Sequence, residues 1–155
     1  MKIELFFTGK TTESFLKAGI DEYLKRLKHY VQVTEVLIEP ARLSKPDFKK
    51  AAEMESGRML DKIKAGDFVI LLDERGKSLG SEELAAFIGK HLQTGISKLI
   101  FVTGGAYGVS DSMKQRANLI LSFSKFTFTH QMIRVLLVEQ IYRAMTILKN
   151  EKYHH

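Results

Sequence analysis

The stretch that decides the fold is LIFVTGGAYG, residues 99–108, an apolar run that ends in three closely spaced glycines. Unbroken apolar runs of this kind are typical of strands buried on both faces of a parallel sheet. Glycine has no Cβ and accepts positive φ, so a strand that ends in glycines lets a ligand approach the main chain closely. A second apolar run, residues 118–121, follows a short polar helical turn. Because α/β proteins bind ligands at the carboxyl edge of the sheet, two such strand ends predict a cleft there.

Residues 122–130, SFSKFTFTH, connect the second of these strands to the last helix and are long for a tight connection. The segment offers backbone amides and carbonyls together with the rings of Phe123, Phe126 and Phe128. Those rings suit an adenine-containing ligand, and they equally suit ordinary core packing, the usual role of phenylalanine. The sequence therefore leaves two interpretations open, an aromatic wall of the cleft and a packed loop.

Strands and helices alternate along the rest of the chain. The expected strands are residues 2–7, 31–38, 68–72, 99–102 and 118–121. Longer helices are expected at residues 12–28, from residue 44 onward, at 81–92 and at 131–149. This alternation predicts an α/β fold, a mostly parallel sheet sandwiched between helices, in a single domain spanning residues 1–155.

Two local features carry more detailed expectations. Residues 44–47, SKPD, have the form of a capping box with proline in the first turn, so the second helix is expected to begin there. The expected buried stripe of that helix is Phe48, Ala52, Met59 and Ile63. Residues 73–77, DERGK, are expected to form a polar loop after the third strand.

The composition is that of an ordinary globular protein, with 155 residues of which 45% are hydrophobic and 27% charged. Cysteine is absent, which excludes a disulfide scaffold and cysteine-based zinc sites and fits a reducing compartment. The N-terminus lacks the apolar core of a signal peptide, and no apolar run approaches the ~20 residues of a membrane span. The formal charge of +6 fits a polyanionic partner, although many basic proteins bind no nucleic acid.

Two glycine motifs resemble phosphate-binding loops, but each lacks a required element. Gly9-Lys10-Thr11 lies at a strand-to-helix turn, yet the position where a Walker A loop needs its first glycine is Glu4, inside the strand. An ordinary turn is therefore favoured there. Residues 104–108, GGAYG, do not match Gly-x-Gly-x-x-Gly, and no strand-borne acid follows about 20 residues later. Both observations count against P-loop and Rossmann nucleotide binding.

The C-terminal region is rich in polar side chains with functional chemistry. These are His130, Arg134, Arg143, Tyr153, His154 and His155. Glu139 and Arg143 stand four residues apart and are expected to pair on the surface of the last helix. Residues 153–155, YHH, are typical of a frayed terminus. No His-Glu-x-x-His or similar ligand spacing occurs, so no metal is expected.

Motifs along the whole chain resemble those of the bacterial 23S ribosomal RNA pseudouridine N3-methyltransferases, a family of the SPOUT class. The motifs are Leu72-Asp73-x-x-Gly76-Lys77, Gly104-Gly105-x-x-Gly108, residues 124–129, His130, Glu139-Gln140-x-Tyr142-Arg143-Ala144 and Tyr153-His154. Each motif is weak alone, but their joint order is specific, and the chain length and element order agree. One departure is His155, where the family pattern leads us to expect a basic last residue.

The resemblance implies a fold whose C-terminal part is tied into a trefoil knot, an arrangement that simple topology rules exclude for most chains. It also implies a cytoplasmic homodimer, S-adenosylmethionine as methyl donor, and 23S rRNA within the assembled 70S ribosome as substrate. By position, the expected donor contacts are Leu72, Gly105, Ser124, Lys125, Phe126, Thr127, Phe128 and Thr129.

The resemblance also suggests roles for four further side chains. The methyl group of a sulfonium donor is already activated, so the enzyme mainly has to align donor and acceptor. N3 of a pseudouridine must lose its proton, and His154 is expected to be the base that accepts it. Tyr153 is expected to stack on or orient the pseudouridine ring. Arg143 and His130 are expected to hold a phosphate or to stabilise the developing imidate.

Two rival functions are compatible with the same fold. One is a non-catalytic RNA- or ribosome-binding module that has lost the donor, which the intact glycine turn disfavours because a mere binder needs no glycines at a strand end. The other is a SPOUT methyltransferase that acts on transfer RNA. The short chain without appended domains and the Tyr153-His154 ending disfavour that second rival.

Overall fold

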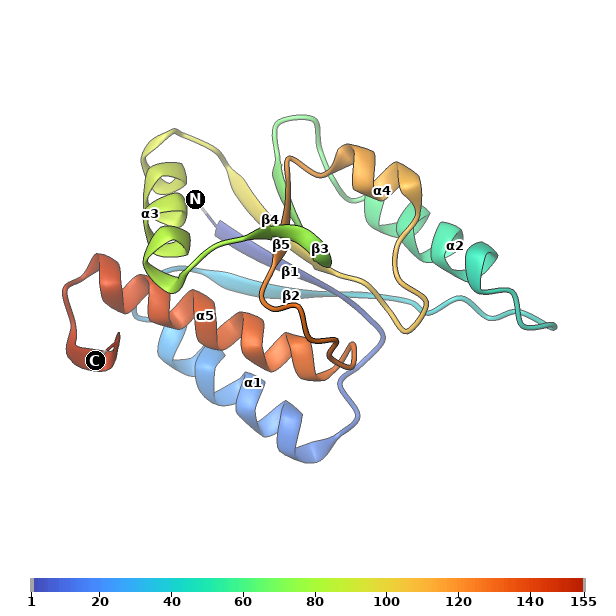
Figure 1. Cartoon of the computed structure of the whole chain (residues 1–155), viewed down its shortest axis with the longest axis horizontal. Helices are drawn as coiled ribbons and strands as arrows, with labels where there is room; N and C mark the ends of the chain where they lie inside the picture. The colour runs from blue at the N-terminus through green and yellow to red at the C-terminus, as the bar shows by residue number, and fades with distance from the viewer. Residues whose placement is uncertain (1, 155) are drawn as a thin grey trace.

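In the computed structural model, which describes residues 2–154, five strands form one sheet in the order β2-β1-β4-β3-β5 (Figure 1). The strands are β1 Lys2–Thr8, β2 Val33–Ile38, β3 Phe68–Ser78, β4 Lys98–Thr103 and β5 Leu119–Ser122. The helices are α1 Ser14–Leu27, α2 Phe48–Leu60, α3 Ser81–Gln93, α4 Asp111–Arg116, α5 Met132–Leu148 and the 3-10 turn η1 Lys152–His154. All pairings between these strands are parallel, which confirms the predicted α/β fold.

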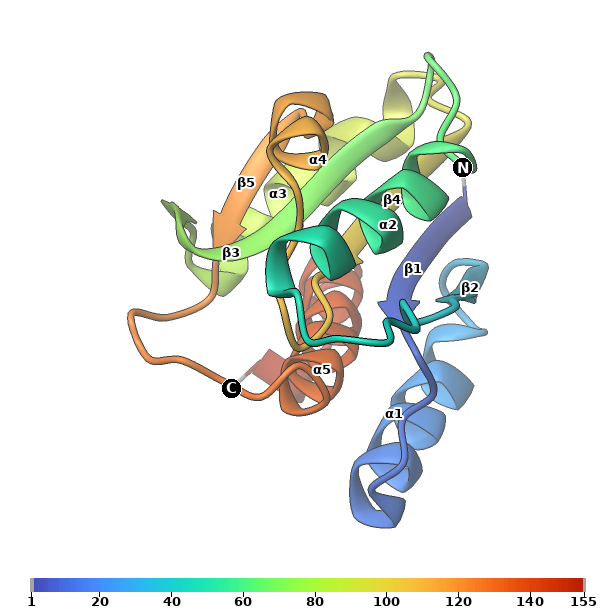
Figure 2. The same ribbon diagram turned by 90° about the vertical axis from the view of Figure 1, so that its right-hand side faces the viewer.

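Helices cover both faces of the sheet and make three layers. Figure 2 shows α2 and α4 on one side of the strands, with α1, α3 and α5 on the other. Within β4 the side chains alternate between the two layers, because successive residues of a strand point to opposite faces. Leu99 and Phe101 join the core under α1, α3 and α5, whereas Ile100 and Val102 join the core under α2 and α4.

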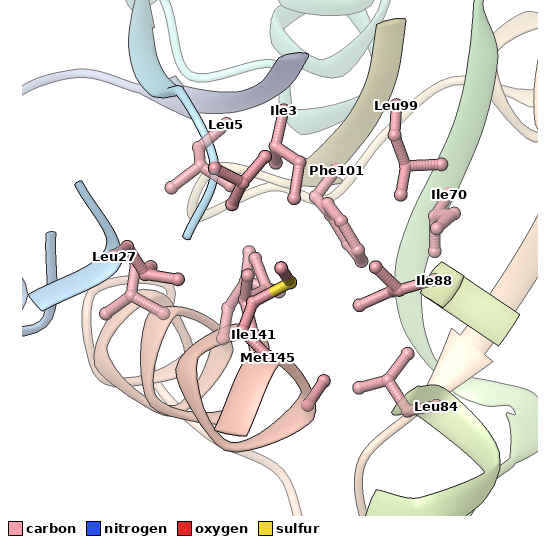
Figure 3. Close-up of a cluster of buried hydrophobic side chains, with 14 of the residues drawn as sticks. Ile3, Leu5, Leu27, Ile70, Leu84, Ile88, Leu99, Phe101, Ile141 and Met145 are labelled. Atoms are coloured by element: carbon pink, nitrogen blue, oxygen red, sulfur yellow. The ribbon is translucent and has the colours of Figure 1, made fainter. Parts of the chain in front are cut away.

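The larger core lies between the sheet and the helices α1, α3 and α5 (Figure 3). Ile3 and Leu5 of β1 and Phe101 of β4 face Ile88 of α3 and Ile141 of α5, and all five are 0% exposed. Burying such a side chain contributes roughly 1.5–3 kcal/mol relative to leaving it in water. This core therefore fixes α3 and α5 against the centre of the sheet.

The second helix begins later than predicted. It starts at Phe48, with Asp47 as its N-cap, and the Asp47 side chain accepts a hydrogen bond of 2.9 Å from the backbone N–H of Lys50. The expected start at residues 44–47 is wrong, because the residue before a proline is disfavoured in the helical region and a good capping residue follows Pro46 directly. The expected burial of Phe48 is also wrong, since its side chain is 65% exposed.

The third strand is longer than predicted. Residues 73–77 continue β3 instead of forming a loop, and a register shift places both Leu72 and Lys77 opposite Leu121 of β5. Gly76 makes this possible, because a Cβ there would lie 2.7 Å from the backbone of Ile120. Glycine thus lets the two strands approach more closely than a side chain would allow.

The end of the chain is ordered against α5. Residues 152–154 form η1, so the expected frayed terminus is wrong for that part, while His155 lies outside the described residues. The turn at Gly9 is confirmed as an ordinary turn, with φ of 72°. No helix within residues 2–154 is long and apolar enough to cross a membrane.

Candidate active site

A pocket of about 570 Å³ opens at the carboxyl edge of the sheet, where the cleft was predicted. Its floor includes Leu72 in β3, Thr103 at the end of β4, and Leu121 in β5. Its walls come from residues 104–109 after β4 and from residues 123–130 after β5. Pockets of this size are typical of small-molecule and cofactor sites.

The glycine-rich wall is built from a turn in which side chains have no room. The Gly108 N–H donates a 3.1 Å hydrogen bond to the Gly105 carbonyl, and Gly108 has φ of 77°. A Cβ on Gly104 would lie 3.2 Å from the Gly108 backbone. A Cβ on Gly105 would lie 2.9 Å from Glu55 Oε2 and 3.1 Å from Thr8 Cβ. Gly105 is therefore packed against buried side chains while it also lines the pocket.

The opposite wall is held in shape by its own hydroxyl groups. Ser122 Oγ donates to the Ser124 carbonyl at 2.9 Å, and the Phe126 N–H donates to Ser124 Oγ at 3.0 Å. Thr129 Oγ1 accepts from the Met132 N–H at 3.1 Å, which ties the end of the loop to the first turn of α5. These bonds fix a connection that has no secondary structure of its own.

The structure decides between the two interpretations of the phenylalanines in this loop. Phe123 packs against the larger core, as an ordinary core residue does. Phe126 is 79% exposed and Phe128 is 41% exposed, and both line the pocket. The loop thus combines one packed ring with two rings that are free to cover a ligand.

Most of the residues predicted to contact the donor lie together in this pocket. Those that line it are Leu72, Gly105, Ser124, Phe126, Thr127, Phe128 and Thr129. Lys125 is exposed and is not among the lining residues. His130 also lines the pocket, whereas Arg143, Tyr153 and His154 do not.

His130 stands close to two buried charges. Burial, followed by the charge of Arg134, lowers the pKa of the His130 imidazole, and the Glu55 carboxylate partly opposes that shift. Glu55 is 3% exposed, and its Oε1 accepts a 3.0 Å hydrogen bond from the Ala41 N–H. Its Oε2 has no hydrogen-bond partner among the described residues. His130 is consequently neutral at pH 7 and able to accept a proton.

Arg134 joins the start of α5 to the turn after β1. Its side chain is 0% exposed and donates hydrogen bonds to the carbonyls of Thr8 and Gly9 and to Thr11 Oγ1. The guanidinium carbon lies 4.9 Å from the centroid of the Phe7 ring. Burial lowers the pKa of Arg134 to about 10, so the group stays charged at neutral pH. It therefore holds the segment behind Gly105 in place.

The other three predicted catalytic residues gather elsewhere, around the C-terminal end of α5. Tyr153 contacts Tyr23 and Glu139 through its hydroxyl, at 3.1 Å and 3.2 Å. Arg143 forms an ion pair with Glu139 at 2.7 Å, as predicted, and lies over the Tyr153 ring at 4.9 Å. We call Tyr23, Glu139, Arg143 and Tyr153 the C-terminal cluster. Burial and the hydrogen bond with Tyr23 raise the pKa of the Tyr153 phenol.

His154 is adjacent to the C-terminal cluster and reaches α3. Its Nε2 lies 3.6 Å from Glu82 Oε1, in the first turn of that helix. The structure therefore divides the predicted catalytic set: His130 lines the pocket, and His154 lies with the C-terminal cluster. Within residues 2–154, no group of three or more His, Asp or Glu side chains is placed to hold a metal ion.

The sequence interpretation missed Glu55 and the buried role of Arg134, although a signal for both was present. Arg134 lies one helical turn before Leu137 and Val138, within the apolar face of α5. Glu55 lies between buried residues of α2 in the same way. A charged residue at the helical spacing of a buried stripe marks a side chain that needs an internal partner.

Comparison with known proteins adds a third line of evidence. A family model described as "Predicted SPOUT methyltransferase" matches residues 1–154. The chain is 46% identical over 156 residues to a protein of Geobacter metallireducens named "Ribosomal RNA large subunit methyltransferase H", a match that covers 100% of this chain and 99% of the relative. A protein of the same name from Syntrophotalea carbinolica is 43% identical over 155 residues, with the same coverage. Both matches span the pocket and the C-terminal cluster.

Proposed function

Because this chain belongs to the SPOUT methyltransferase family, we propose that it methylates N3 of a pseudouridine in 23S rRNA, with S-adenosylmethionine as donor. The relatives named as large-subunit ribosomal RNA methyltransferases match the chain over its whole length, which supports ribosomal RNA as the substrate class. We further propose the assembled 70S ribosome as the form of that substrate. The family also implies the knotted C-terminal part, which stays a prediction.

The observation that carries this proposal is the pocket between the glycine turn and residues 123–130. A donor with an adenine ring and a charged amino-acid end needs close main-chain approach, aromatic surface and nearby charge. The turn at Gly105 supplies the first and Phe126 supplies the second, while Asp73 and Glu74 also line the pocket with carboxylates. The residues present therefore fit the donor, which when bound supplies an activated sulfonium methyl group.

The remaining chemistry falls to side chains of the chain itself. N3 of pseudouridine carries a proton that must leave for the nitrogen to act as nucleophile, so a base within hydrogen-bond reach is required. We assign this role to His154, with Tyr153 orienting the acceptor ring and Arg143 facing its phosphate or the developing imidate. His130, which lines the pocket, is assigned to charge stabilisation beside the reacting groups.

A homodimer reconciles these roles with the geometry. Arg143, Tyr153 and His154 do not line the pocket of their own chain. We propose that a second copy of the chain brings its C-terminal cluster and His154 to the pocket opening. In a symmetric dimer each copy then completes the site of the other.

The test is methyl transfer from labelled S-adenosylmethionine to intact ribosomes, separated subunits and transfer RNA, with mass mapping of the modified nucleotide. Calorimetry measures donor binding in parallel. We expect saturable donor binding and one methylated pseudouridine in 23S rRNA of intact ribosomes. Donor binding with methylation of transfer RNA alone would replace the substrate, and absence of donor binding would leave only a ribosome-binding module.

The base assignment has its own test. We expect His154→Ala to lower single-turnover methyl transfer at neutral pH by about 10²-fold or more, the usual contribution of a general base. Donor affinity should stay unchanged, because His154 does not line the donor pocket of its chain. Full single-turnover activity in the variant would show that another group removes the proton.

A further inference from the structure

A pair of stacked aromatic rings lies exposed beside the pocket. Phe48, the first residue of α2, and Tyr107, in the glycine turn, have ring centroids 4.8 Å apart and an angle of 14° between their planes. Phe48 is 65% exposed and Tyr107 is 47% exposed. Large apolar rings with this much exposure are the informative exceptions on a protein surface, since core packing does not explain them.

The pair is continuous with the pocket on one side only. Tyr107 lines the pocket, whereas Phe48 does not. A molecule that occupies the donor pocket can therefore touch Tyr107, but Phe48 is available to something that extends past the pocket opening. The two rings together form what we call the aromatic step, composed of Phe48 and Tyr107.

The segment that leads into the aromatic step is strongly basic. Residues 42–50 contain four cationic side chains and one acidic one, Asp47, which is engaged as the N-cap of α2. Among the residues that the structure describes, Lys45, Lys49 and Lys50 form no ion pair, and all three are exposed. The flank of the aromatic step therefore carries positive charge that this chain does not neutralise.

We propose that the aromatic step stacks on an unpaired base of the RNA substrate next to the target nucleotide, while Lys45, Lys49 and Lys50 contact its phosphates. This inference rests on the proposed function, and it names the surface that receives RNA outside the methyl-transfer site. Every base has a π face, so aromatic rings beside a basic groove bind single-stranded RNA with little sequence preference. A second copy of this basic chain would place like charges together, whereas RNA complements them.

The first experiment compares Phe48→Ala with Phe15→Ala. Phe15 is a matched control, because it is also 65% exposed and lies on α1, on the other face of the sheet. Base stacking on an aromatic ring contributes enough that truncation weakens RNA binding roughly 5- to 100-fold. We expect the Phe48 variant to raise the KM for ribosomes about tenfold, with kcat at saturating ribosomes and donor affinity unchanged. Phe48→Tyr should restore the wild-type KM.

The second experiment detects the stacking directly. The chain contains no tryptophan, so Phe48→Trp introduces a single indole at the aromatic step. We expect its fluorescence to be quenched when an RNA hairpin that carries the target loop is added at low salt. Phe15→Trp serves as the control and should not be quenched. Quenching that disappears at high salt would agree with phosphate contacts by the neighbouring lysines.

The outcomes separate this inference from the proposed function. If the wild-type protein fails to bind donor or to methylate ribosomes, the proposed function is wrong. If the wild type is active but Phe48→Ala matches Phe15→Ala in KM and Phe48→Trp is not quenched, the aromatic step does not bind RNA. A Phe48→Ala protein that loses its dimer in sedimentation, with kcat reduced, would instead assign the surface to a second copy and overturn the inference.

Discussion

At the scale of single residues, Gly105 is the position where the pocket wall tolerates least change. A methyl group there would meet Glu55 Oε2 at 2.9 Å and Thr8 Cβ at 3.1 Å, on the side away from the pocket. We predict that Gly105→Ala pushes the turn into the pocket and lowers donor affinity at least tenfold, because the donor depends on this main chain. Calorimetric titration with S-adenosylmethionine measures the effect.

Gly57 provides the matched control, since a Cβ at this position in α2 meets nothing within 4 Å. Alanine is favoured over glycine in a helix by roughly 0.8–1 kcal/mol, so Gly57→Ala should stabilise the protein slightly. Its donor affinity should match the wild type. Equal donor affinity in the two variants would mean that the Gly105 turn does not shape the donor site.

His130 predicts a dependence of stability on pH. Burial and Arg134 lower the pKa of His130 in the folded protein below its ordinary value of 6.5. The unfolded chain then takes up the proton first, so this residue's contribution to stability is present above pH 6.5 and is lost as the pH falls toward the lowered pKa. Urea unfolding should show a smaller loss of stability between pH 7.5 and 5.5 in His130→Gln than in the wild type. An equal loss in both proteins would contradict the lowered pKa.

At the scale of elements, Arg134 is the main polar connection between α5 and the turn after β1. Its removal leaves the carbonyls of Thr8 and Gly9 without their donor inside the protein. We predict that Arg134→Met lowers the free energy of unfolding by about 2–4 kcal/mol, as for buried groups that lose charged hydrogen-bond partners. Thermal unfolding measures the change.

Arg26→Met is the control for that variant, because Arg26 forms an exposed pair with Glu22 four residues earlier on α1. Exposed pairs of this spacing contribute about 0.3–0.5 kcal/mol, so its unfolding temperature should hardly move. A comparable loss in both variants would show that burial of the Arg134 guanidinium does not determine its contribution.

The elements also show which features the sequence predicts and why others escape it. The five strands and the cleft at their carboxyl ends were predicted, because apolar runs and glycines report burial and close approach directly. The extension of β3 through residues 73–77 was missed, because its pairing depends on Gly76 meeting the Ile120 backbone, a contact between distant segments. The ordered turn at Tyr153 was missed for the same reason, since its partners lie on α1 and α5.

At the scale of the whole molecule, the division between pocket and C-terminal cluster predicts complementation between two inactive variants. In the proposed dimer, Gly105→Ala disables one pocket, and Tyr153→Ala removes the residue that it lends to the other copy. Co-expression should yield mixed dimers that carry one intact site each. Because about half of all dimers are mixed, methyl transfer should recover to roughly a quarter of the wild-type rate.

Separately purified variants that cannot exchange subunits are the control for this experiment, and their mixture should stay inactive. Sedimentation of the co-expressed protein confirms that dimers have formed. Dimers without recovered activity would show that pocket and C-terminal cluster of the same chain act together after a rearrangement.

The central place of β1 in the sheet governs when the protein becomes functional during its synthesis. Ile3 pairs with Val33 on one side and with Leu99 on the other, so the strand made first waits for a partner made almost two thirds of a chain later. Contacts between such distant segments make folding slow, and domains complete themselves only as translation proceeds. The nascent chain must also release the residues after β5 from the exit tunnel before its last wall closes. Cofactor capture is therefore a post-translational event in this protein, and partially synthesised chains should carry no methyl-transfer activity.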